Sequence, residues 1–139
     1  MKRNDLLTVT SLLSVLLFSI HLTDDIGRGI EPGGWANLAG FVLISVVWLC
    51  GTLLLSGRRS GQVITLLGSL LAAAVPVLHM KGVGVGAYFT RYGGFRFVWT
   101  LLALGVTGTF SLVLLASGLW SRKAGGTMAG THEDPDRRG

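Results

Sequence analysis

The side chains best suited to chemistry in this sequence are two histidines and a pair of adjacent carboxylates. Asp24 and Asp25 follow His21 at three and four positions, and Arg28 follows both carboxylates at the same spacings. In a helix, these spacings place side chains on one face. His79 ends a separate apolar stretch. These five residues form the candidate polar site.

Three kinds of chemistry fit such a group. Histidine is the commonest metal ligand and titrates near neutral pH, so a metal site with Asp24 or Asp25, or a proton or quinone site, is one alternative. Two histidines on facing helices are also the usual axial ligands of a haem in a bundle. The structural alternative is that His21 and His79 each stabilise a helix C-terminus through the helix dipole. We expect no bound cofactor as the leading case, with haem or a metal ion as the alternatives.

The elements that must position these residues are apolar helices. The chain has 139 residues, of which 50% are hydrophobic and 14% charged, against about 25% charged in a soluble protein. Four apolar segments, at about 6–22, 38–55, 63–80 and 97–120, contain no Asp, Glu, Lys or Arg. Their lengths suit helices crossing a bilayer. The sequence therefore predicts an all-α, up-and-down four-helix transmembrane bundle spanning residues 1–120.

Basic residues predict the orientation. With the N-terminus in the cytoplasm, eight of the twelve Lys and Arg residues lie on the inner side, which is the side they favour. Both termini are then cytoplasmic. The first segment lacks a small-x-small cleavage site, so we expect a retained helix and not a signal peptide. Residues 121–139 are polar and lack apolar periodicity, which predicts a disordered cytoplasmic tail containing His132.

Polar residues recur along two of the predicted helices. The first carries Thr10, Ser14 and His21 on one face, and the third carries a stripe of small and polar residues that ends in a histidine: Thr65, Ser69, Ala72, Pro76 and His79. Polar groups in a bilayer seek partners inside the bundle. Because these two helices run in the same direction, His21 and His79 should both lie at the outer membrane boundary and could meet there.

The remaining motifs of the sequence say less about function. Gly82–Ala87 matches a loose dinucleotide fingerprint, but no strand precedes it, so we interpret it as a loop. Gly105 and Thr109 form a small-x-x-x-small pattern that predicts helix packing. Trp48 and Cys50 are expected to pack inside the bundle. No nucleophile–histidine–acid arrangement is present, which favours a protein that is not an enzyme, and the scattered basic residues argue against nucleic-acid binding.

The stretch H-L-T-D-D-I-G-R-G-I-E-P-G-G, residues 21–34, resembles a segment of small, uncharacterised bacterial four-helix inner-membrane proteins. The resemblance implies a multi-pass protein of the bacterial inner membrane and brings no activity, substrate or cofactor. We therefore expect a non-enzymatic accessory or structural subunit, with lipid, itself or other membrane subunits as partners. The alternative is a small carrier or redox subunit with a metal, haem or proton site built from His21 and His79.

Overall fold

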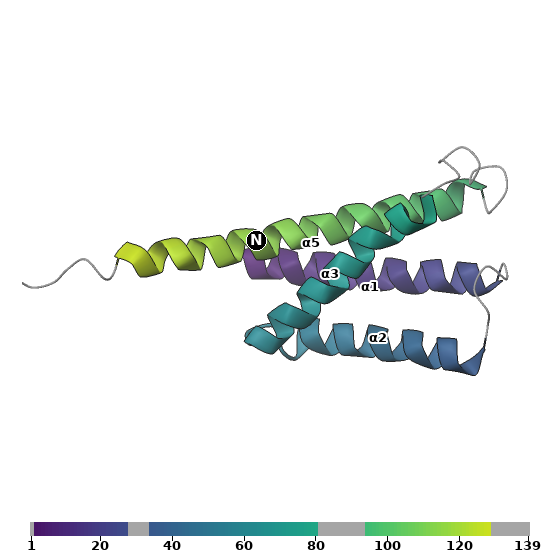
Figure 1. The fold of residues 1–139 in the computed structure, drawn as a ribbon, viewed down its shortest axis with the longest axis horizontal. Helices are drawn as coiled ribbons and strands as arrows, with labels where there is room; N and C mark the ends of the chain where they lie inside the picture. The colour runs from purple at the N-terminus through teal and green to yellow at the C-terminus, as the bar shows by residue number, and fades with distance from the viewer. Residues whose placement is uncertain (1, 28–33, 81–93, 129–139) are drawn as a thin grey trace, which may run out of the picture.

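Four helices make up the part of the chain that the computed structural model describes, which is residues 2–27, 34–80 and 94–128. They are α1 (Arg3–Gly27), α2 (Trp35–Leu53), α3 (Arg59–Met80) and α5 (Gly94–Met128). Successive helices run in opposite directions, so α1 begins at the end of the bundle toward which α5 runs (Figure 1). The predicted all-α, four-helix, up-and-down fold is confirmed within these residues.

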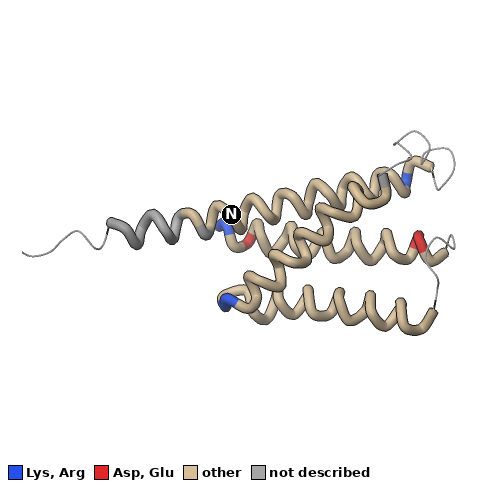
Figure 2. The backbone as a smooth tube through the Cα atoms, viewed as in Figure 1, with Lys and Arg blue, Asp and Glu red and all other residues tan. Residues whose placement is uncertain are grey.

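Each helix is long and apolar enough to cross a membrane. Large apolar side chains also cover the outside of the bundle; Leu43 and Val106, for example, are 64% and 68% exposed. Water would penalise so much contiguous apolar surface, whereas lipid does not. The chain is therefore a multi-pass membrane protein. The charged side chains of the described part gather at the two ends of the bundle (Figure 2).

The helix boundaries differ from the expected ones mainly by extension. Helix α1 continues past residue 22 to Gly27, which carries Asp25 into the helix. Helix α5 continues past residue 120 to Met128, so residues 121–128 are helical where the sequence predicted a disordered tail. The apolar segments mark only the part of each helix inside lipid, whereas backbone hydrogen bonding continues into the interface. Residues 129–139, with His132, lie outside the described residues, as does most of the Gly-rich loop.

Hydroxyl groups join the helices in the half of the bundle where α1 begins. Ser14 donates to Thr107 Oγ1 and Ser111 donates to Thr10 Oγ1, both at 2.9 Å, which connects α1 to α5. On the other side of α1, Ser11 accepts a hydrogen bond from the Trp48 indole at 2.9 Å and pairs with Thr52 at 2.7 Å. The expected inward stripe of α1 therefore faces the interior.

Helix α3 crosses the bundle diagonally (Figure 1). In its first half it packs on α2 at Gly68, where an added Cβ would collide with the Trp48 indole. Trp48 is buried, in agreement with the packing role expected for it. Further along it packs on α5, where Gly105 faces Pro76 and Gly108 faces Ala72. Cys50, in contrast, is only partly buried, so the fully buried position expected for it is not found.

Replacing Gly108 by Ala should destabilise the bundle. A Cβ there would lie 2.7 Å from Ala72 Cβ and 2.8 Å from the Ala73 backbone nitrogen, so α3 and α5 would have to separate. Overpacking of this kind costs about 1–3 kcal/mol. The matched control is Gly40→Ala in α2, where a Cβ meets nothing within 4 Å. Thermal unfolding in detergent should show a lower midpoint for Gly108→Ala alone; equal midpoints for the two variants would contradict the close α3–α5 contact.

Candidate metal centre

The candidate site begins with two side chains one turn apart on α1. His21 and Asp25 stand at positions i and i+4, and His21 Nε2 lies 3.3 Å from Asp25 Oδ2. Both side chains are only 1% exposed. The extension of α1 beyond the apolar segment makes this contact, because the i to i+4 spacing brings side chains together only in a helix. A carboxylate this deeply buried needs positive partners or hydrogen-bond donors.

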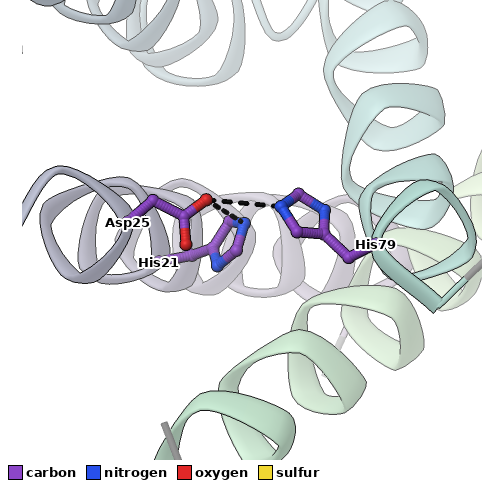
Figure 3. A group of neighbouring side chains, drawn as sticks. All are labelled: His21, Asp25 and His79. Atoms are coloured by element: carbon purple, nitrogen blue, oxygen red, sulfur yellow. Dashed lines mark hydrogen bonds and ion pairs between the residues drawn. The ribbon is translucent and has the colours of Figure 1, made fainter. Parts of the chain in front are cut away.

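His79 brings the end of α3 to the same carboxylate oxygen (Figure 3). Its Nε2 lies 3.3 Å from Asp25 Oδ2, and its side chain is 24% exposed. The rings of His79 and His21 meet edge to face with their centroids 4.8 Å apart. The two histidines therefore meet, as the shared direction of α1 and α3 allowed, and Asp25 lies between them.

The other nitrogen of His79 restricts the chemistry of this contact. Nδ1 lies 3.0 Å from the Val75 carbonyl oxygen, which can only accept, so Nδ1 carries a hydrogen and donates it. A neutral His79 would then present the lone pair of Nε2 to Asp25 Oδ2. Two acceptors at 3.3 Å repel unless a cation lies between them. The pair therefore needs one proton or one metal ion at this position.

The three donor atoms have the spacing of a metal-binding group. His21, Asp25 and His79 each offer one atom, and these atoms all lie within 4.8 Å of one another. A tetrahedral ion with bonds of about 2.0–2.2 Å holds its ligand atoms about 3.3–3.6 Å apart. Both nitrogen-to-carboxylate distances, at 3.3 Å, match this spacing, whereas the widest pair of the group, at 4.8 Å, would have to close for all three atoms to hold one ion. The donation from His79 Nδ1 to Val75 is the outer-shell contact that metal-binding histidines commonly make.

Two further polar atoms of the cluster have unused capacity. His21 Nδ1 and Asp25 Oδ1 are buried and have no hydrogen-bond partner among the residues that the structure describes. Buried polar atoms normally have a partner, so these two atoms are places where a bound water would be accommodated. Neither atom belongs to the three donor atoms named above.

Phe97 of α5 closes the site on one side. Its ring lies 5.5 Å from the His21 ring and 6.2 Å from the His79 ring, measured between centroids, and the side chain is 1% exposed. Phe97 is not among the candidate residues predicted from the sequence. The available signal was its position, since it begins the fourth apolar segment, at the membrane boundary expected for both histidines.

The two neighbouring carboxylates separate in the structure. Asp24 pairs with Arg96 of α5, with 3.4 Å between Arg96 Nη2 and Asp24 Oδ1. Of the predicted site residues, the structure brings the ligand atoms of His21, Asp25 and His79 together, and Asp24 adds no atom to that group because adjacent helix positions differ by about 100° around the axis. Arg28, the expected partner of these carboxylates, lies outside the described residues.

The arrangement also bears on the haem alternative. Two axial imidazoles would lie on opposite faces of a macrocycle, whereas the rings of His21 and His79 touch each other and both direct Nε2 to one oxygen. The geometry favours a small cation over a haem.

In the residues that the structure describes, fold and site define a multi-pass membrane protein of four helices with a largely buried His–Asp–His cluster at one end of the bundle. No family model matches the chain, and no curated protein or solved structure matches it either. The resemblance of residues 21–34 to a bacterial membrane family thus stays a prediction.

Removal of the Asp25 charge should destabilise the protein much more than removal of the Asp24 charge. Asp25→Asn takes away the charge that lies beside both histidine nitrogens, and breaking a buried pair costs about 3–5 kcal/mol. Asp24→Asn makes the same change in charge beside Arg96, which is 80% exposed, and should cost about 1 kcal/mol or less. Denaturant titration in mixed micelles measures the difference. Equal losses would mean that Asp25 is not the centre of the cluster.

Proposed function

We propose that this chain is a multi-pass protein of a bacterial inner membrane that binds one first-row transition metal ion, with Zn²⁺ as the reference ion. The ligands are His21 Nε2, Asp25 Oδ2 and His79 Nε2. The observation that carries the proposal is the position of Asp25 Oδ2, which lies 3.3 Å from Nε2 of both histidines. In His79 the other ring nitrogen, Nδ1, already donates to the Val75 carbonyl.

Nitrogen and carboxylate ligands suit zinc and its neighbours in the first transition row. Three protein ligands leave a coordination position open to water or substrate, which is the pattern of catalytic and transport sites. The partly exposed His79 gives an ion a route to the cluster from the end of the bundle. The expected accessory or structural role is compatible with such an ion, because a metal that joins α1 to α3 also stabilises the bundle.

Zinc binding should require both histidines and Asp25. The untagged His132→Ala protein, which lacks the third histidine of the chain and serves as the reference, should bind one Zn²⁺ per chain in detergent by calorimetry. Loss of an outer-shell contact already costs about 10–100-fold in metal affinity, so His21→Ala or His79→Ala should cost at least about 100-fold. Affinity should also fall from about pH 7.5 to about pH 5.5, because protons compete for imidazole nitrogen.

Asp24→Asn is the matched control for this titration. It removes a carboxylate next to Asp25 that pairs with Arg96 and contributes no atom to the cluster. Its zinc affinity should stay within about 2-fold of the reference value, as a change outside both coordination shells leaves the metal undisturbed. If the reference protein binds no zinc, or if all variants bind equally, the metal proposal fails, and a proton between Asp25 and His79 becomes the explanation of their contact.

We further propose that both ends of the chain lie in the cytoplasm. Arg3, Arg58 and Arg59 belong to the end of the bundle where α1 begins, and Lys and Arg favour the cytoplasmic side. Trp35 and Trp99, which are 87% and 61% exposed, mark the opposite end, as interfacial aromatic residues do. The metal site then faces the outer side of the membrane.

Reporter fusions in bacterial cells test this orientation. A green fluorescent protein fused after Gly139 should fluoresce, and alkaline phosphatase inserted within residues 81–93 should be active, because the first reporter functions only inside and the second only outside. The matched control exchanges the two reporters and should abolish both signals. Phosphatase activity at the C-terminus would reverse the orientation and place the His–Asp–His cluster on the cytoplasmic side.

A further inference from the structure

A cleft opens at the end of the bundle opposite the metal site. Helix α3 touches α5 at Ala72 and Pro76 but packs on α2 through Gly61 and Gly68, so α3 and α5 diverge toward the start of α3 (Figure 1). The resulting cleft has a volume of about 400 Å³ and is lined by residues of α1, α3 and α5. It is formed by the crossing of α3 and is unrelated to the histidine cluster.

The walls and the rim of the cleft differ in character. The walls are mostly apolar and include Leu66 and Leu115, with the side-chain amides of Asn4 and Gln62 among them. The rim carries Arg3 and Arg59. The Arg3 guanidinium extends across α5 at Gly118, where its Cζ lies 2.9 Å from the position that a Cβ would occupy. The absence of a side chain at Gly118 thus lets a cation lie over the cleft.

The positive charge at this rim is not neutralised by the protein. Within the described residues, neither Arg3 nor Arg59 forms an ion pair. Asp5 is the acidic side chain that the structure describes at this end, and it lines a different pocket, between α1, α2 and α3. Its carboxylate accepts a hydrogen bond from the Lys2 backbone N–H at 3.1 Å. Two guanidinium groups therefore flank an apolar cleft without a described counter-charge.

We propose that this cleft binds one anionic phospholipid. Its phosphate lies between Arg3 and Arg59, and one acyl chain lies between α3 and α5 against Leu66 and Leu115. Guanidinium groups bind phosphate through paired, charge-assisted hydrogen bonds. A free phosphate would make no use of the apolar walls, and a neutral lipid would leave both arginines without a counter-charge. A second copy of this chain would bring the same positive rim with it.

Native mass spectrometry of the full-length, delipidated protein tests this proposal. Phosphatidylglycerol should form a complex with one lipid per chain, and phosphatidylcholine with the same acyl chains should bind much more weakly. The double variant Arg3→Gln/Arg59→Gln should bind phosphatidylglycerol about 30-fold more weakly, the loss expected from two basic residues near a lipid headgroup. Leu66→Trp, which fills the apolar part and keeps both arginines, should also reduce binding.

Arg58→Gln is the matched control, because Arg58 neighbours Arg59 and is exposed but does not line the cleft. It should change the affinity for phosphatidylglycerol by no more than about 2-fold, well below the effect of a basic residue that contacts a headgroup. Unchanged thermal unfolding of each variant establishes that the fold is intact. Four results would overturn the proposal: equal binding of the two lipids, equal losses in Arg58→Gln and the double variant, displacement of the lipid by inorganic phosphate alone, or a wild-type dimer that Leu66→Trp dissociates.

Discussion

The buried carboxylate of Asp25 is the constraint on which the arrangement of the helices depends. A carboxylate that is 1% exposed, in a bundle surrounded by lipid, is stable only where donors or cations surround it. One partner, His21, comes from the same helix, but His79 must be supplied by α3, and Phe97 of α5 excludes water from the other side. Three helices therefore have to converge at this end of the bundle. Small residues make that convergence sterically feasible, since Gly105 and Gly108 let α5 approach α3 closely in the two turns that precede His79.

The same convergence explains the opposite end of the molecule. A straight helix that meets α5 near Pro76 and crosses it at an angle must move away from α5 toward its other end, where α2 receives it. Packing of Trp48 against Gly68 fixes that second contact. The cleft beside Leu66 is thus a geometric consequence of the crossing of α3 over α5.

Much of the site could be predicted from spacing alone. The i to i+4 relation of His21 and Asp25 is local, and the shared direction of α1 and α3 placed His79 at the same boundary. The pairing of Asp24 with Arg96 could not be predicted, because it depends on where α5 lies beside α1. Phe97 was missed because nothing distinguishes an interior aromatic residue from a lipid-facing one by type.

The hydroxyl stripe of α1 was also only partly predictable from the sequence. Its inward orientation was predictable, because hydroxyl groups in lipid seek partners. Its partners were not, since Thr107 and Ser111 lie on α5 and bond to α1 across a long stretch of sequence.

Residues 121–128 are helical and not disordered as predicted, for a separate reason. Hydropathy reports where lipid ends, but a helix that has already formed can continue into water, here even across Gly125 and Gly126, because propagation costs less than nucleation.

The placement of the polar groups also limits what the cluster can do as it stands. Between Ser14 and His21, α1 rises about 10 Å, and the interior at this level is filled by Val15, Phe18, Leu101 and Leu104. Within the described interior, the buried hydroxyl of Thr100 lies at this level and donates to the Arg96 carbonyl of its own helix. Among the described residues, no hydrogen bond links it to the hydroxyls around Ser14 or to the His–Asp–His cluster. The described polar side chains therefore form no continuous hydrogen-bonded path between Asp25 and the Arg3 end, and transport through the bundle would require α3 to move relative to α5.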